Sequence, residues 1–262
     1  MVRCTDIPAF VICLESKSAT RCDANMRSIQ SVFPLAQRTR AVDAATLDIP
    51  EDPRVSCYAK YHSKHTIDAD IMHIGSSGAI GCSLSHIAMW QNCVSLGRPI
   101  VVIEDDMFIN ERKANQIYTA MSKIPLNSEF ASILYLPFMS NTRSCNGEWC
   151  PIKYTFGGLQ LYYVTPVGAN ILLREAFPVV THADVYIGVM AETHPELNAV
   201  RWNEHIYTGY EAVKDNMSST LGHNVCIRKI LPHSNVFYIV CISLFVVVGV
   251  WATITTMKLA KA

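Results

Sequence analysis

Three consecutive acidic residues, Glu104, Asp105 and Asp106, follow an apolar run and are the strongest candidates for chemistry in this sequence. The run itself, residues 99–103, predicts a buried strand, and ligands bind at the carboxyl ends of strands in open α/β sheets. Carboxylate oxygens suit Mn²⁺ or Mg²⁺. Their spacing predicts Glu104 and Asp106 on one side of an extended backbone, as metal ligands. Alternatively, Asp106 caps a turn or a helix.

A stretch of small residues precedes this strand. Gly81, Ser85 and His86 lie within residues 78–96, where the apolar periodicity predicts a helix. Small residues near a helix start let a ligand approach the backbone N–H groups, which suit phosphates. Ser85 and His86 lie off the apolar stripe and could face a pocket. The alternative is a helix packed tightly on the sheet, with His86 hydrogen-bonded in the core.

Two more positions are weaker candidates. Arg21, with Lys17 nearby, follows the first predicted strand, where a cation could meet a diphosphate. Most such cations are simply solvated. Asp184 follows the apolar residues 176–180, and a lone aspartate there is usually a cap.

The elements that position these residues alternate short apolar runs with helical patterns, which predicts an α/β sheet with helices on both faces. Gly157-Gly158 predicts a hairpin between its two flanking strands. The predicted strands are residues 9–14, 38–42, 99–103, 131–136, 152–156 and 159–164. The predicted helices are residues 18–31 (Ser18 as N-cap), 78–96, 111–122 and 166–176. Residues 43–70 are polar and irregular and predict a long loop. After Asp184 the alternation of apolar runs and helical patterns weakens.

The overall composition excludes some classes of protein. The 262 residues include 22 Lys and Arg and 22 Asp and Glu, so the formal net charge is zero. Nucleic-acid binding needs a basic face, so we expect no nucleic acid partner. Hydrophobic residues make up 50% and charged residues 17%, which argues against disorder. Mean hydropathy is +0.19, and the excess is concentrated in one segment.

That segment is residues 236–257, which contain no charged side chain. As a helix it would extend about 33 Å, enough to cross a bilayer core of about 30 Å. A buried core helix is the alternative. We therefore predict a domain over residues 1–232, a single-pass transmembrane segment over 233–257 and a short tail over 258–262. The predicted location is a membrane such as that of the endoplasmic reticulum.

The flanking charges do not decide the orientation of this anchor, because two basic residues lie on either side of it. The first residues do not form a signal peptide, which favours a cytosolic domain. The sequon at Asn216 would be modified only in the secretory lumen.

The ten cysteines are widely spread. They form no CxxC pair, and we see no histidine spaced with them as in a zinc site. Cys145 and Cys150 could close a small loop. Several of the others fall in apolar runs, and most are predicted to be reduced, buried thiols, which favours a reducing compartment.

Taken in order, four stretches of the sequence resemble glycosyltransferase family 25, which includes bacterial lipooligosaccharide glycosyltransferases and collagen galactosyltransferases. The most specific stretch, residues 78–106, holds the Gly-Cys-x-x-Ser-His helix and the Glu-Asp-Asp strand end. Weaker matches are FVICLESKSATR (residues 10–21), AVDA (residues 41–44) and residues 157–184.

This resemblance implies a GT-A-like fold, a UDP-linked nucleotide-sugar donor and Mn²⁺ or Mg²⁺. It implies Glu104 and Asp106 as metal ligands and Asp184 as the base or a structural cap on the side of the glycan or glycoprotein acceptor. The donor side would use the positions that match the family motifs, namely Arg21, Gly81, Ser85, His86 and Asp105. The expected reaction transfers a hexose to a hydroxyl group, with inversion preferred.

Two positions depart from the family pattern near the expected diphosphate. Cys13 stands where an asparagine is typical, and Ser16 where a basic residue is typical. An inactive, membrane-anchored binding module of the same fold is therefore one alternative. A nucleotidyltransferase, which would release pyrophosphate, is another.

Overall fold

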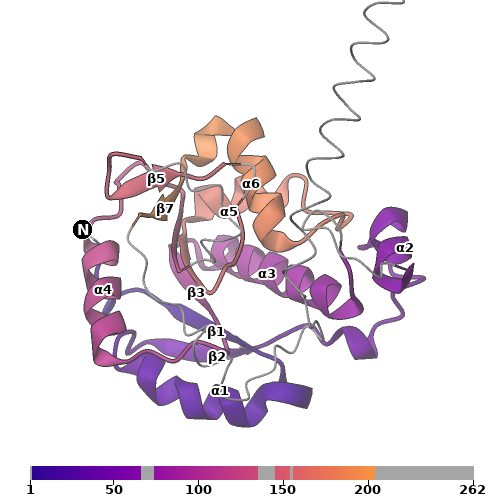
Figure 1. Ribbon diagram of the computed structural model, residues 1–262, viewed down its shortest axis with the longest axis horizontal. Helices are drawn as coiled ribbons and strands as arrows, with labels where there is room; N and C mark the ends of the chain where they lie inside the picture. The colour runs from indigo at the N-terminus through magenta and orange to yellow at the C-terminus, as the bar shows by residue number, and fades with distance from the viewer. Residues whose placement is uncertain (1, 66–73, 135–144, 154–155, 204–262) are drawn as a thin grey trace, which may run out of the picture. The chain divides into compact units, whose positions relative to one another are not determined.

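The computed structural model describes residues 2–65, 74–134, 145–153 and 156–203. In this part of the chain, a seven-stranded sheet has the order β2-β1-β3-β6-β4-β7-β5 (Figure 1). Its strands are β1 (Ala9–Cys13), β2 (Ala36–Arg40), β3 (Ile100–Glu104), β4 (Phe130–Leu134), β5 (Trp149–Pro151), β6 (Leu161–Val164) and β7 (Ala199–Trp202). Its helices are α1 (Glu15–Gln30), α2 (Cys57–His65), α3 (Ser77–Leu96), α4 (Glu111–Ser122), α5 (Pro166–Leu173) and α6 (Ala183–Thr193), with 3-10 turns η1 (Ala44–Thr46) and η3 (Pro195–Leu197).

The sheet is mixed, with both parallel and antiparallel pairs of strands. Strand β1 lies between β2 and β3 and is parallel to both. Strand β6 is antiparallel to its neighbours β3 and β4, and β4 is parallel to β7. The carboxyl ends of β1, β2 and β3 therefore meet at one edge of the sheet, where a ligand site is expected.

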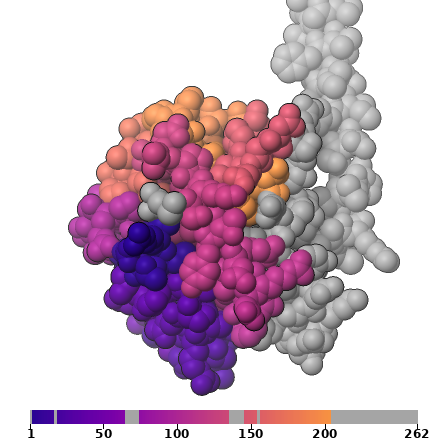
Figure 2. Space-filling model, turned by 90° about the vertical axis from the view of Figure 1, so that its left-hand side faces the viewer, coloured from indigo at the N-terminus to yellow at the C-terminus, as the bar shows by residue number. Residues whose placement is uncertain are grey.

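Helices cover both faces of the sheet, because alternate residues of its buried strands point in opposite directions. In β3, Val101 and Ile103 pack in the cluster that includes α1 and α4. Ile100 and Val102 pack in the cluster that includes α3, α5 and α6. Tyr118 of α4 donates a hydrogen bond of 3.1 Å to the carbonyl oxygen of Ser31, just after α1. Figure 2 shows the indigo N-terminal segment and the magenta segment adjoining on one surface.

Helix α3 confirms the prediction for residues 78–96 to within one residue. The Ser76 side chain caps it by accepting a hydrogen bond of 3.2 Å from the backbone N–H of Ala79. It ends at Leu96, where Gly97 adopts the left-handed conformation, with φ of 63°. This well-defined helix carries several of the predicted site residues.

Close packing holds α3 against the segment that follows β2. Ser85 Oγ accepts a hydrogen bond of 2.8 Å from the backbone N–H of Val42 and donates one of 2.7 Å to the carbonyl oxygen of Gly81. A Cβ atom at Gly81 would lie only 2.7 Å from the carbonyl oxygen of Val42. Gly81 therefore has the packing role that was the alternative to ligand binding.

Replacing Gly81 with alanine is expected to lower the free energy of unfolding by roughly 1–3 kcal/mol, as overpacking typically does. The added methyl group meets a backbone atom, which cannot rotate away. Denaturant unfolding of the full chain measures the change. Ser95→Ala, at an exposed position of the same helix, should leave stability nearly unchanged. An unchanged midpoint for Gly81→Ala would contradict the close packing.

Several predicted elements were correct in type but differ in their ends. Helix α4 matches its predicted bounds, whereas β2 lies two residues earlier than predicted and α5 ends earlier. Helix α1 begins at Glu15, so Ser18 is not its N-cap; the N-cap position is Leu14, whose side chain makes no capping hydrogen bond. Favourable cap residues therefore do not always mark where a helix starts.

The hairpin predicted at Gly157-Gly158 was wrong. Strand β5 pairs with β7 and β6 pairs with β3 and β4, so the strands on either side of the two glycines are not neighbours. The prediction of one long loop over residues 43–70 was also wrong in part, because η1 and α2 lie within it. The weak pattern after Asp184 concealed α6, η3 and β7, since their buried positions show no simple alternation.

The cysteine prediction was right in one loop and wrong in another. Cys145 and Cys150 form a disulfide, which closes the small loop anticipated from their spacing. Cys13 and Cys22 were predicted to be thiols but also form a disulfide, between the end of β1 and α1. Within the described ranges, the unpaired cysteines are Cys4, Cys57, Cys82 and Cys93.

The predicted membrane segment over residues 233–257, the tail and the Asn216 sequon all lie outside the described residues. None of the helices in the part of the chain that the structure describes has the length and hydropathy needed to cross a membrane.

Candidate functional site

A cavity of about 160 Å³ opens where the carboxyl ends of β1, β2 and β3 meet the first turns of α3. It brings together most of the predicted site residues, because strands that are distant in sequence end at the same edge. Its polar and charged lining is Arg21, Asp43, Ser77, Cys82, Ser85, His86, Glu104, Asp105 and Asp106, and its other lining residues are Ile12, Leu14, Ala41, Val42, Ala44, Ala45 and Gly78.

The three acids enter this cavity where β3 gives way to a turn: Glu104 is the last residue of the strand, and Asp105 and Asp106 lie in the turn. β3 ends at Glu104, whose carbonyl oxygen accepts a hydrogen bond of 3.3 Å from the backbone N–H of Met107. The Glu104 side chain is 29% exposed and Asp106 is exposed, so both are accessible to a ligand. Asp106 does not cap the following helix, since the Asn110 side chain caps α4 by accepting from Lys113 N–H.

The acids repel one another. Burial of the carboxyl group against the cavity wall and repulsion from Glu104 and Asp105, opposed by Arg21, raise the pKa of Asp106 to about 7. Because the residue as a whole is exposed, we give more weight to the repulsion between the acids than to the burial. The cluster therefore holds negative charge that a cation would relieve.

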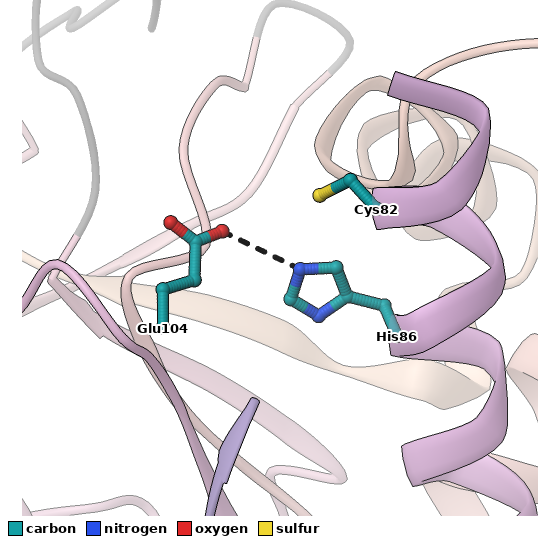
Figure 3. A group of neighbouring side chains, drawn as sticks. All are labelled: Cys82, His86 and Glu104. Atoms are coloured by element: carbon teal, nitrogen blue, oxygen red, sulfur yellow. Dashed lines mark ion pairs between the residues drawn. The ribbon is translucent and has the colours of Figure 1, made fainter. Parts of the chain in front are cut away.

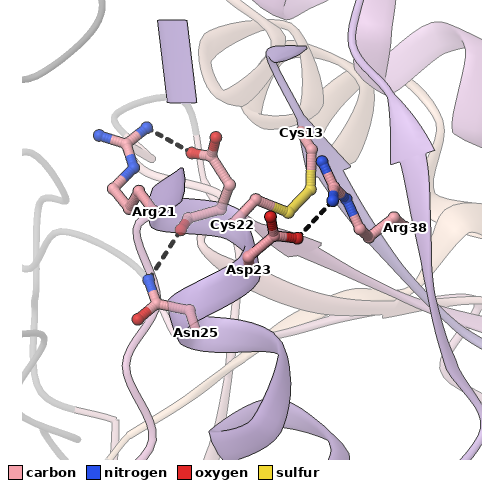
Figure 4. Close-up of a disulfide and its surroundings, with 7 residues drawn as sticks. Cys13, Arg21, Cys22, Asp23, Asn25 and Arg38 are labelled. Carbon is pink, nitrogen blue, oxygen red and sulfur yellow. Dashed lines mark hydrogen bonds and ion pairs between the residues drawn. A yellow bond between two sulfur atoms is a disulfide. The ribbon is translucent and has the colours of Figure 1, made fainter. Parts of the chain in front are cut away.

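Arg21 is the cation of the cavity wall. Its Nη2 atom lies 2.5 Å from Asp105 Oδ1, and the two side chains are only 15% and 11% exposed (Figure 4). Asn25 Nδ2 donates a hydrogen bond of 2.9 Å to the carbonyl oxygen of Asp105, which fixes the same turn to α1. Among the described residues, the buried Nε of Arg21 has no hydrogen-bond partner. Arg21 thus lines the cavity, held by Asp105, with one buried donor left unsatisfied.

The two positions that depart from the family pattern are both bonded to residues near the cavity. Cys13 is bonded to Cys22, next to Arg21 in α1 (Figure 4). Ser16 donates a hydrogen bond of 2.5 Å to Asp43, and Asp43 in turn lines the cavity. Cys13 and Ser16 are not among the residues that line the cavity, but each is bonded to a residue that lines it or adjoins one that does.

His86 is buried, with 1% exposure, and its ring connects the core to the acids. Its Nδ1 atom lies 3.2 Å from the hydroxyl oxygen of Tyr162, which also accepts a hydrogen bond of 3.2 Å from Trp90 Nε1. Its Nε2 atom lies 3.4 Å from Glu104 Oε1. His86 therefore orients Glu104 and is itself oriented by Tyr162.

Cys82 is a site residue that the sequence reasoning missed. It lies one helical turn before His86, so both side chains face the cavity from α3, opposite Glu104 (Figure 3). Burial, followed by the charges of Glu104 and Asp184, raises the pKa of its thiol. The i, i+4 spacing of Cys82 and His86 was the signal that could have identified the pair.

Asp184 makes hydrogen bonds of the capping kind, which was one of its two predicted roles. Its Oδ2 atom accepts a hydrogen bond of 2.7 Å from the backbone N–H of Gly158. Its Oδ1 atom accepts one of 2.8 Å from Val185 N–H, in the first turn of α6. Both carboxylate oxygens thus accept hydrogen bonds from the backbone. Asp184 is not among the described residues that line the cavity.

The fold and the cavity define an α/β protein with a cavity at the carboxyl edge of its parallel strands, where such folds place their ligand sites. A family model described as glycosyltransferase family 25 (LPS biosynthesis protein) matches residues 7–187, which is more than half of the chain. The chain belongs to glycosyltransferase family 25. No curated protein matches it.

Proposed function

We propose that the chain is a metal-dependent glycosyltransferase of GT-A-like fold. It would move a hexose from a UDP-linked nucleotide sugar to a hydroxyl of a glycan, lipid-linked or protein acceptor. The observation that carries this proposal is the cavity in which Arg21 and three carboxylates meet at one sheet edge. This arrangement offers a cation for a diphosphate and oxygen ligands for a metal ion, as the reaction requires.

The acidic cluster is chemically suited to Mn²⁺ or Mg²⁺. Its donors are carboxylate oxygens, and Glu104 and Asp106 both have surface open to a ligand. The raised pKa of Asp106 reflects a site where negative charges lack compensation. Glu104 and Asp106 would hold the ion, which when bound would neutralise charge on the departing nucleoside diphosphate.

The protein's own side chains would share the work around that ion. Arg21 would donate hydrogen bonds to the diphosphate, since it lines the cavity and carries a positive charge. Asp105 would keep Arg21 in place through their ion pair. Ser85 and His86 would position other parts of the site. Ser85 hydrogen-bonds the segment after β2, and His86 orients Glu104.

The test is a panel of nucleotide sugars incubated with the full chain, with and without Mn²⁺, and scored for release of nucleoside diphosphate. We expect release with one donor class, dependent on the ion and increased by acceptor. Release of pyrophosphate would favour a nucleotidyltransferase instead. Absence of both donor binding and product release across the panel would favour an inactive binding module.

A further inference from the structure

We propose that Cys82, His86 and Glu104 form a second kind of metal site, for a borderline-soft cation of which Zn²⁺ is the representative. The donor atoms of these three side chains all lie within 4.8 Å of one another. Thiolate and imidazole ligands favour Zn²⁺, whereas the carboxylate cluster beside them favours Mn²⁺ or Mg²⁺. The two sites would share Glu104.

The measured spacing is close to what tetrahedral Zn²⁺ requires. Two N and O ligands at about 2.0–2.1 Å from the metal, at a tetrahedral angle, stand about 3.4 Å apart. His86 Nε2 and Glu104 Oε1 are 3.4 Å apart. Cys82 would complete the set by a small movement of its side chain. The fourth position would face the cavity, which all three residues line.

The surroundings of His86 suit a metal ligand. Metal-binding histidines are usually oriented by a hydrogen bond at the other ring nitrogen. Tyr162 supplies that partner at Nδ1 and is itself fixed by Trp90 Nε1. Cys82 and His86 both project from α3, so two of the ligands come from one rigid element (Figure 3).

Binding of Zn²⁺ would change the protonation of its ligands and the orientation of Glu104. The Cys82 thiol proton leaves to solvent as the sulfur–zinc bond forms. Any proton on His86 Nε2 also leaves to solvent, and the ring that binds the metal through Nε2 carries its one proton on Nδ1, taken up from solvent where Nδ1 lacks it, facing Tyr162. Glu104 turns one carboxylate oxygen from His86 to the metal. Because Glu104 is a ligand common to both sites, Zn²⁺ would compete with Mn²⁺ for it and would oppose activity supported by Mn²⁺. This last consequence rests on the proposed function.

The direct test uses Co²⁺ and Zn²⁺ alone with the full chain, purified in detergent without thiol reductant. Co²⁺ bound to a thiolate gives a near-ultraviolet charge-transfer band. We expect this band in the wild type and in Cys57→Ser, an exposed free cysteine of α2 that serves as the matched control. We expect it to be absent in Cys82→Ser and in Cys82→Ala. Zn²⁺ should displace Co²⁺ and abolish the band.

The affinity for Zn²⁺ should fall at least about 100-fold in Cys82→Ser, since changes to outer-shell partners alone cost 10–100-fold. Absence of a thiolate band in the wild type would overturn the proposal, and that result requires no variant. Equal Zn²⁺ affinity in Cys82→Ser and the wild type would also overturn it.

Measurements of sugar transfer in the presence of Zn²⁺ separate this inference from the proposed function. Zn²⁺ should inhibit Mn²⁺-supported transfer in the wild type and inhibit Cys82→Ser less. If the nucleotide-sugar panel gives no activity but the cobalt band is present, the proposed function fails and the Cys82 site stands. If transfer is active but the band is absent, the Cys82 site fails and the proposed function stands.

Discussion

Asp106→Asn is expected to lower the rate of sugar transfer by about 10²–10³-fold, the usual loss when one electrostatic contact to a transition state is removed. Asparagine keeps the shape of the side chain and removes a charged oxygen ligand from the cavity. The effect should appear in kcat, with a higher Mn²⁺ concentration needed for half-maximal activity. Steady-state kinetics over a series of Mn²⁺ concentrations measures both quantities.

The folding of this variant should be intact. Asp106 is exposed and is disfavoured in its charged form by Glu104 and Asp105, so a neutral replacement relieves repulsion. Thermal unfolding should therefore show no loss of stability. Asp48→Asn, the same substitution at an exposed loop position, is the matched control and should keep full activity. Full Mn²⁺-dependent activity in Asp106→Asn would dismiss Asp106 as a metal ligand.

Much of the site could be predicted from the sequence because local patterns located its parts. The apolar run before Glu104 identified β3, and the periodicity of residues 78–96 identified α3. The topology then brings these two elements and β1 to one sheet edge, as expected for an α/β fold. Glu104 and Asp106, the two predicted metal ligands, both line the resulting cavity.

The roles of individual residues were harder to predict, since they depend on contacts between segments that are distant in sequence. Asp105 and Arg21 are 84 positions apart and are joined only by the fold. Gly81 was predicted to let a phosphate approach the helix, yet its lack of a side chain lets the Val42 carbonyl oxygen pack closely against it. Asp184 engages a glycine 26 positions before it. None of these partners can be recognised from local spacing.

The errors in predicting the fold from the sequence have a similar origin. A Gly-Gly pair predicts a hairpin only when the two flanking strands pair with each other. Here the sheet order instead places β4 and β7 between β6 and β5. In β7 all four residues are buried, among them Arg201, so the strand shows no alternation of polar and apolar positions. The pairing of these strands depends on tertiary contacts, which the local sequence pattern does not reveal.

Arg21→Ala is expected to lower kcat/KM for the nucleotide sugar by about 100-fold, because the cavity would lose its cation for the diphosphate. Arg21→Lys retains the charge but not the planar arrangement of donors, so it should fall between alanine and the wild type. The measurement is steady-state kinetics with the donor varied at saturating Mn²⁺. Arg38→Ala is the matched control, because Arg38 pairs with the exposed Asp23 of α1 and is not among the residues that line the cavity (Figure 4).

A structural explanation for such a loss must be separated from a direct role. Removing Arg21 also leaves Asp105 without its ion-pair partner in a largely buried position, which would itself destabilise the turn. The double variant Arg21→Ala/Asp105→Asn removes that charge. If Arg21 binds the diphosphate, the double variant should regain stability but stay about 100-fold less active. Recovery of activity together with stability would show that Arg21 acts only by neutralising Asp105.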